Sequence, residues 1–220
     1  MSAVAAMALS PPRVRRLGRA DYAATLARMQ EFTATRGPAA PDELWLLEHP
    51  PVYTLGRNAR PEHVLDPGAT PVVRCDRGGQ VTWHGPGQVV IYALLDLGRL
   101  GLGVRELVER LEGAVIDLLA EHGITGRGRR DAPGVYVDGA KIAALGLRIR
   151  RGCSYHGLAF NVDCELAPFA RINPCGHAGL PVTRLADLVP GSEPHRAGEA
   201  LLGYLLRRLG LPQPAARSGS

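Results

Sequence analysis

The sequence predicts a single α+β domain, in which helices pack against a mainly antiparallel or mixed sheet. The chain has 220 residues and is 45% hydrophobic, which is enough for one substantial core. Strand-like and helical segments are mixed without the strict alternation that a parallel sheet requires. Because no internal repeat or long linker divides the chain, we expect a lead-in at residues 1–20, one domain at residues 21–211 and a disordered tail at residues 212–220.

The first half of the chain is expected to form one helix and four strands. Asp21 can cap the helix, which should run to about Thr33. Pro50 and Pro51 mark a turn between the first two strands. The fourth strand is apolar throughout, which is typical of a strand buried on both faces. The expected strands cover residues 44–47, 52–55, 81–83 and 89–95.

The second half is expected to add two amphipathic helices, a hairpin and a further strand. Apolar side chains recur at helical spacing in residues 104–122, and Gly123 then ends the helix. Asp138 and Gly139 can supply the type I′ turn of a β-hairpin. The strand should lie at about residues 155–162 and the second helix at residues 196–209. The apolar stripe of the first helix consists of Leu107, Val108, Leu111, Val115, Leu118 and Leu119.

Lys141, on the return strand of this hairpin, is the single lysine among 26 basic residues. Arginine keeps its proton in proteins, whereas burial can tune a lysine to release one. An unbroken two-residue period would place Lys141 on the apolar side of the strand, so we consider it a candidate catalytic group. The alternatives are an exposed lysine beside a turn, or a bulge near Gly146 that breaks the period. The same side would carry Ala143, Leu145, Leu147 and Ile149.

The charge pattern restricts the partners. The formal net charge is +5, with short arginine clusters at residues 127–130 and 148–151 that are not interleaved with aromatic side chains. Nucleic-acid binding is therefore disfavoured, whereas an acidic protein partner fits these clusters. Arginines follow the apolar first residues instead of preceding them, and no apolar run is long enough to span a membrane. We expect a cytoplasmic protein without membrane contact.

Several common sites for metals and nucleotides are missing from the sequence. The four cysteines form no Cys-x-x-Cys pair, and no His-Glu-x-x-His motif is present. The only lysine follows alanine, so a phosphate-binding Gly-x-x-x-x-Gly-Lys loop cannot occur. We therefore expect no metal site and no nucleotide cofactor.

A glycine-rich loop at residues 77–87 is the first candidate for ligand binding. Its four glycines allow a close approach of backbone to a ligand, and Trp83 and His84 add an apolar wall and a titratable donor. The alternative is a connection between buried strands in which His84 is only hydrogen-bonded.

Cys175 is the candidate nucleophile, because Pro174 and Gly176 can present it at a loop tip. The reactive form is the thiolate, which a nearby ammonium favours. Lys141 could be its charge partner or base, and His84, His156 and His177 remain alternatives. Cys75, Cys153 and Cys164 lie near strand-like sequence and are expected to be structural.

Four motifs together resemble the signature of the lipoyl(octanoyl) transferases. They are Arg-Gly-Gly-Gln-Val-Thr-Trp-His-Gly-Pro-Gly-Gln at residues 77–88, Gly-Ala-Lys-Ile-Ala-Ala-Leu-Gly at 139–146, Tyr-His-Gly-Leu-Ala-Phe-Asn-Val-Asp at 155–163 and Asn-Pro-Cys-Gly at 173–176. A weaker match covers residues 46–57, so the resemblance extends from about residue 41 to residue 188. Phe160 stands where leucine is more usual, and His177 stands where a more apolar side chain is expected.

The resemblance implies the fold shared by lipoate and biotin ligases and one catalytic acyltransferase domain. An octanoyl group would move from acyl carrier protein to a lysine of a lipoyl domain, without a cofactor. Cys175 would carry the acyl group and Lys141 would activate it. The acyl pocket would be lined by Arg77, Gly78, Gly79, Gln80, Val81, Thr82, Trp83, His84, Ala144, Leu145, Gly146, Gly157, Leu158 and Ala159.

The implied acceptors are the lipoyl domains of 2-oxoacid dehydrogenase complexes and the glycine cleavage H protein. Three other functions stay open. An ATP-dependent lipoate or biotin ligase of the same fold would need no cysteine nucleophile. A non-catalytic module that binds acylated proteins would use Cys175 only for packing. A cysteine hydrolase using Cys175 and a histidine would leave the glycine-rich loop without a purpose.

Overall fold

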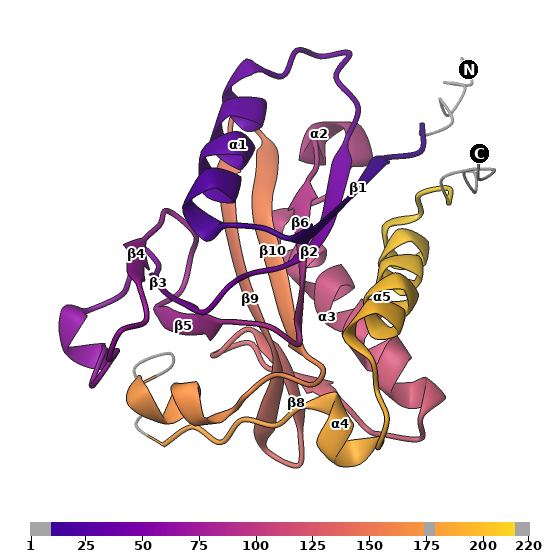
Figure 1. The fold of residues 1–220 in the computed structure, drawn as a ribbon. Helices are drawn as coiled ribbons and strands as arrows, with labels where there is room; N and C mark the ends of the chain where they lie inside the picture. Colours follow the sequence, from indigo (N-terminus) through magenta and orange to yellow (C-terminus); the bar gives the residue numbers. More distant parts are fainter. Residues whose placement is uncertain (1–9, 174–178, 214–220) are drawn as a thin grey trace.

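Two sheets organise the computed structural model, which describes residues 10–173 and 179–213 (Figure 1). The larger sheet has seven strands in the order β1-β2-β6-β10-β9-β8-β7, and the smaller has three in the order β4-β3-β5. Only the β1–β2 pair of the larger sheet is parallel. The predicted α+β class with a mixed sheet is therefore confirmed.

The strands of the larger sheet are β1 (Arg13–Arg19), β2 (Glu43–Glu48), β6 (Gln88–Leu94), β7 (Arg127–Gly128), β8 (Gly134–Val137), β9 (Ala140–Arg150) and β10 (Cys153–Asn161). The smaller sheet contains β3 (Val52–Leu55), β4 (Val72–Arg74) and β5 (Val81–His84). The helices are α1 (Tyr22–Thr35), α2 (Leu97–Leu100), α3 (Val104–Glu121), α4 (Leu185–Leu188) and α5 (Pro194–Leu209), with short 3-10 turns at Pro61–His63 and Ala167–Arg171. None of these helices is both long and apolar enough to cross a lipid bilayer.

Every strand and helix predicted from the sequence is present, but the short elements β4, β7, α2 and α4 were not predicted, and neither was the longer strand β1 inside the predicted lead-in. Its side chains are mostly exposed or half-buried, so it carries no apolar alternation. The strand is held by its parallel pairing with β2. The prediction for α1 was accurate, because Asp21 caps it by accepting the backbone N–H of Ala24 at 2.8 Å.

The helices cover both faces of the larger sheet. The helices α3 and α5 pack on one face, and α1 lies on the other (Figure 1). The predicted stripe of α3 explains this packing: its leucines at 107, 111, 118 and 119 are buried, and Val108 is half-buried. The apolar run of β6 is buried along its whole length, because it lies between these two layers.

The β8–β9 hairpin forms as predicted, but a bulge changes the side to which Lys141 points. Val135 pairs with Ala143 and Tyr136 pairs with Lys141, so Ile142 is an extra residue on β9. Tyr136 lies between two valines that pack into the core beneath α3. Its partner Lys141 must therefore face the opposite side of the sheet. The prediction that Lys141 shares the side of Ala143 and Leu145 was wrong, although the side chain is buried, with 6% of it exposed.

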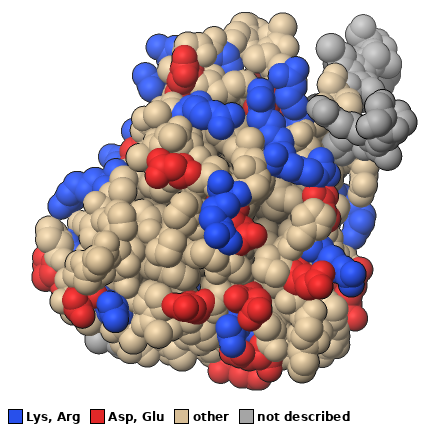
Figure 2. Space-filling model, in the orientation of Figure 1, with Lys and Arg blue, Asp and Glu red and all other residues tan. Residues whose placement is uncertain are grey.

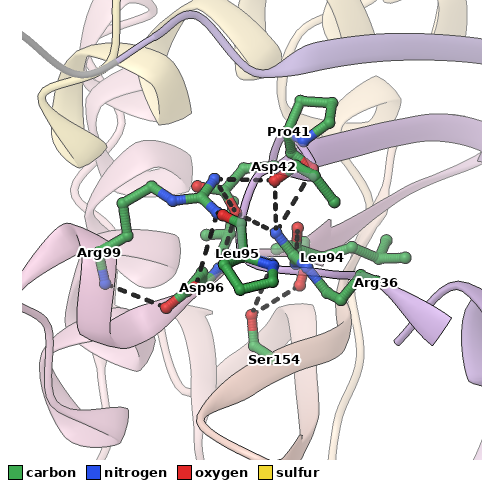
Figure 3. Close-up of polar contacts among 11 residues, drawn as sticks. Arg36, Pro41, Asp42, Leu94, Leu95, Asp96, Arg99 and Ser154 are labelled. Carbon is green, nitrogen blue, oxygen red and sulfur yellow. Dashed lines mark hydrogen bonds and ion pairs between the residues drawn. The ribbon is translucent and has the colours of Figure 1, made fainter. Parts of the chain in front are cut away.

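A buried ion pair ties the elements at the other end of the sheet (Figure 3). Arg36 follows α1, Asp42 precedes β2, and their side chains lie 2.7 Å apart with only 4% and 5% exposed. Asp42 also accepts the backbone N–H of Asp96 at 2.7 Å, and Arg36 donates to the carbonyl of Leu94 at 3.1 Å. Additional hydrogen bonds of this kind offset the cost of removing two charges from water.

Replacing Asp42 should destabilise the fold strongly. We expect Asp42→Ala to lower the free energy of unfolding by about 3–5 kcal/mol, because Arg36 would remain buried without its partner. Urea denaturation measures this value. The control is Glu199→Ala, which removes the partner of the half-exposed Arg16 and should cost less than about 1 kcal/mol. Equal losses in the two variants would contradict a special role for the buried pair.

Candidate active site

A cavity of about 380 Å³ lies on the face of the larger sheet that α1 covers. Its floor has few side chains, because Gly146 pairs with Gly157 and Ala144 pairs with Ala159 across β9 and β10. A Cβ added at Gly157 would lie 2.0 Å from the carbonyl oxygen of Ile91. A Cβ at Gly146 would likewise lie 2.9 Å from Cδ of Arg77, so both glycines allow a close approach of other protein groups at the edge of the cavity.

The glycine-rich loop forms a wall of this cavity. The backbone N–H of Gly78 donates to the carbonyl of Leu147 at 2.8 Å, which fastens the loop to β9. The buried guanidinium of Arg77 donates to both the carbonyl and the hydroxyl of Thr54 at 2.8 Å. The loop is therefore held in place by the small sheet on one side and by the large sheet on the other.

All the residues predicted for the acyl pocket line this one cavity except Trp83. The indole of Trp83 is buried in a separate core cluster, where it packs edge-on against Phe169 with ring centroids 5.6 Å apart. The lining also includes polar residues that the sequence analysis did not assign to a pocket. Among them are Tyr22, Gln88, Tyr92, His156 and Asn161. For most of these, a polar side chain inside an otherwise apolar segment was the feature that could have indicated a pocket residue.

Neutral imidazole rings form a buried cluster beside the cavity. His49 lies 2.7 Å from the hydroxyl of Tyr92, and His84 lies 2.7 Å from the side-chain oxygen of Gln88. Tyr22 stacks on His84, with ring centroids 5.7 Å apart. Burial lowers the pKa of His84 to about 3, and it also holds the pKa of His49 below its usual value. Both rings are consequently uncharged at neutral pH.

His156 is held in a strained conformation in the middle of β10. Its φ of 61° lies in the left-handed region, which is costly for a residue other than glycine. Its Nε2 lies 2.9 Å from Asp76, which also accepts hydrogen bonds from Tyr155 and Gln30. Although burial opposes ionisation, these hydrogen bonds hold the pKa of Asp76 well below its usual value. Nδ1 of His156 has no hydrogen-bond partner among the described residues.

His156 and Lys141 lie at different ends of the cavity. His156 pairs with Leu147, six residues along β9 from Lys141, which corresponds to roughly 15–20 Å of strand. The Nζ atom of Lys141 lies 3.5 Å from the carbonyl of Pro133 and 5.2 Å from the ring centroid of Tyr136. The cavity thus has a cluster of uncharged imidazoles, with Asp76 beside His156, at one end and an amine at the other.

The segment that follows the predicted nucleophile, at residues 181–183, is hydrogen-bonded to the backbone of Lys141 in β9. The backbone N–H of Lys141 donates to the carbonyl of Pro181 at 2.8 Å, and Thr183 donates to the carbonyl of Lys141 at 3.0 Å. On the other side, Asn173 donates to the carbonyl of His63 at 2.8 Å. Cys175 and His177 lie outside the described residues, so the pairing of Cys175 with Lys141 stays a prediction.

The three described cysteines are free thiols in structural surroundings. Burial raises the pKa of Cys164 to about 12, and burial also raises the pKa of Cys153. The half-buried Cys75 donates its S–H to the carbonyl of Leu55 at 3.4 Å. The two buried cysteines are therefore poor candidates for a reactive thiolate.

Comparison with known proteins identifies relatives over almost the whole chain. A family model described as the lipoyl protein ligase A/B catalytic domain matches residues 21–205. The octanoyltransferase of Dechloromonas aromatica (strain RCB) is 61% identical over 199 residues, which cover 90% of this chain and 97% of that protein. The octanoyltransferase of Methylococcus capsulatus (strain ATCC 33009 / NCIMB 11132 / Bath) is 61% identical over 203 residues, covering 92% and 98%.

Solved structures confirm the predicted fold. Lipoate-protein ligase A bound with ATP superposes with a TM-score of 0.78 at 15% identity, covering 94% of this chain and 88% of that one. A bipartite lipoate protein ligase from Thermoplasma acidophilum, studied with its E2 lipoyl domain, superposes with a TM-score of 0.77 at 15% identity, covering 94% and 87%. At this level of identity the similarity concerns the fold alone.

The buried histidines should make stability depend on pH. Below the pKa of about 6.5 of an unfolded histidine, the unfolded chain binds protons that the buried His84 ring does not accept. The free energy of unfolding should therefore fall between about pH 7.5 and about pH 5.5, and His84→Asn should show a weaker dependence. Urea denaturation across this range is the measurement, with the exposed His122→Asn as control. A pH dependence in His84→Asn as steep as in the unmodified protein would contradict the assignment.

Proposed function

The chain belongs to the lipoyl protein ligase A/B catalytic-domain family and to its octanoyltransferases, and from this premise we propose how it transfers its acyl group. An octanoyl group leaves acyl carrier protein, becomes a thioester on Cys175, and ends as an amide on a lysine of a lipoyl domain. The observation that carries the proposal is the cavity, which joins the predicted pocket residues to Lys141.

The cavity suits a medium-length acyl chain. Its volume of about 380 Å³ lies in the range of small-molecule sites, and its lining includes apolar or small strand residues, among them Leu145, Gly146 and Gly157. An octanoyl chain buries about seven CH₂ or CH₃ groups, which contribute roughly 5–6 kcal/mol. The distance between Lys141 and the imidazole cluster near His156 leaves room for the chain to lie along β9 and β10. The acyl carbonyl would then be placed at the Lys141 end.

Three observations support Cys175 as the nucleophile. It occupies the cysteine of the Asn-Pro-Cys-Gly motif, and the two buried cysteines have pKa values raised by burial. The chain beyond it is bound to the backbone of Lys141 through Pro181. Exchange between thioesters is nearly isoenergetic, and conversion of a thioester to an amide is downhill, so the reaction needs no nucleotide.

Lys141 supplies the proton transfers in both halves of the reaction. As an ammonium it favours the Cys175 thiolate, which attacks the thioester carbonyl and displaces the carrier thiolate. The ammonium then gives its proton to the departing thiolate and becomes a neutral amine. In the second half, the lysine of the lipoyl domain attacks the acyl-enzyme, Cys175 leaves as thiolate, and Lys141 takes the proton of the attacking amine.

The donor and the acceptors follow from the same proposal. Acyl carrier protein is acidic, and a protein with a formal net charge of +5 attracts it. On the face shown in Figure 2, basic and acidic side chains are interspersed, so attraction over this face is spread rather than focused. The lipoyl domains of 2-oxoacid dehydrogenase complexes and the glycine cleavage H protein are the proposed acceptors.

Replacing the nucleophile should abolish the covalent intermediate. We expect the unmodified protein, mixed with octanoyl acyl carrier protein and without ATP, to gain one octanoyl group by intact-protein mass spectrometry. Cys175→Ser should show no thioester adduct, whereas Cys153→Ser and Cys164→Ser should still show it. An octanoyl thioester that persists on Cys153 or Cys164 in Cys175→Ser would contradict the proposal, and a strict need for ATP would indicate a ligase.

Replacing Lys141 by arginine should separate charge from proton transfer. Arginine keeps the positive charge but does not release its proton, so we expect Lys141→Arg to lower the rate of octanoyl transfer to a lipoyl domain by at least about 100-fold. The measurement is single-turnover transfer from preformed acyl-enzyme, followed by mass spectrometry. Near-normal transfer by this variant would show that positive charge alone is needed.

A further inference from the structure

Glu112 is a carboxylate in the buried face of α3, a face that is otherwise apolar or small. Only 9% of the side chain is exposed. Its Oε1 accepts the backbone N–H of Gly134 at 2.8 Å. A Cβ added at Gly128 would lie 2.5 Å from its Oε2, so a larger residue there would displace the carboxylate. Burying a carboxylate is costly, and the packing of α3 gives no reason for it.

The peptide between Pro133 and Gly134 joins this carboxylate to Lys141. Its N–H donates to Glu112, and its carbonyl oxygen accepts from Nζ of Lys141 at 3.5 Å. Lys141 packs directly on the same unit, because a Cβ at Gly134 would lie 3.2 Å from Cε and 3.4 Å from Nζ. One peptide plane therefore contacts the carboxylate on one edge and the amine on the other.

We propose that Glu112 is a positioning residue, which places the Lys141 amine through the Pro133–Gly134 peptide. This inference rests on the proposed function, because it takes Lys141 as the catalytic amine. The hydrogen bond at the N–H polarises the peptide and strengthens its carbonyl as an acceptor. The same hydrogen bond also fixes the position of the Pro133–Gly134 peptide, against which the Lys141 amine packs. A misplacement of about 1 Å in a catalytic group can cost about 100-fold in rate.

Two substitutions separate the position of the acceptor oxygen from its charge. Glu112→Gln keeps the length of the side chain and an acceptor oxygen, whereas Glu112→Asp keeps the charge but withdraws the carboxylate by one methylene. We expect Glu112→Gln to stay within about threefold of the unmodified kcat for octanoyl transfer. Glu112→Asp should lose about 100-fold in kcat, with KM for the octanoyl carrier unchanged. Unchanged kcat in Glu112→Asp, or an equal loss in both variants, would overturn the proposal.

The matched control is Glu109→Asp, on the exposed side of the same helix. Glu109 pairs with Arg105 and is 60% exposed, so its shortening should leave kcat unchanged. Gly128→Ala provides a second way to move the carboxylate if Glu112→Asp does not fold. Its added methyl group would meet Oε2, and we expect the same loss in kcat.

The single lysine of the chain allows a readout that does not depend on activity. In protein labelled with ¹³C-lysine, one Cε signal reports on Lys141, and the ring of Tyr136, 5.2 Å from Nζ, displaces its proton shifts. We expect this displacement to persist in Glu112→Gln and to shrink toward the value of an exposed lysine in Glu112→Asp. An identical signal in both variants would overturn the positioning role. If the unmodified protein transferred no octanoyl group, the proposed function would fail while this comparison still decided the positioning.

Discussion

The cavity lies over a stretch of the central strands that carries glycine and alanine at paired positions. Gly146 and Gly157 face each other across β9 and β10, and neither can carry a Cβ without meeting backbone or the side chain of Arg77. Ala144 and Ala159 form the next pair along the cavity. In a close-packed interior such a strip would be filled by side chains from the covering layer. Here the glycine-rich loop packs against Gly146 through Arg77 and Gly78, and its backbone is tied to Leu147, so it forms a fixed wall of the cavity.

The bulge at Ile142 connects this cavity to its amine. Without the extra residue, the regular period of β9 would direct Lys141 into the leucine-rich core under α3, where an amine would have few polar partners. The bulge turns it toward the carbonyl of Pro133 and the ring of Tyr136 instead. Lys141 is thereby both buried and solvated by protein groups. A change of one residue in strand register is thus what makes a buried lysine available to the cavity.

The two ends of the cavity differ in electrostatic character. Near His156 the imidazole rings are uncharged, since burial lowers their pKa, and the charged Asp76 carboxylate is held by hydrogen bonds from His156, Tyr155 and Gln30. At the other end, the Lys141 amine and the buried Glu112 contact opposite edges of the same peptide group, between Pro133 and Gly134. Neutral rings and a carboxylate whose hydrogen bonds come from protein groups cost less to cover with an apolar chain than groups that depend on water, whereas the Lys141 end keeps groups that can hold or move a proton. Chain binding and chemistry are therefore kept apart along one strand pair.

The sequence by itself determined the longer helices, most of the strands and many of the residues that line the cavity. Helical spacing in α3, the cap at Asp21 and the Asp138–Gly139 turn depend on neighbouring residues, so local patterns were enough to predict them. The motif segments likewise identified the residues that line the cavity. Three features were decided only by the tertiary structure: the side of Lys141, the burial of Trp83 behind the cavity and the pairing of β1 with β2. Each of these features depends on contacts between segments that are distant in the chain. A strand bulge, packing against another layer and pairing with a parallel strand do not change the spacing of apolar residues, so the sequence pattern does not reveal them.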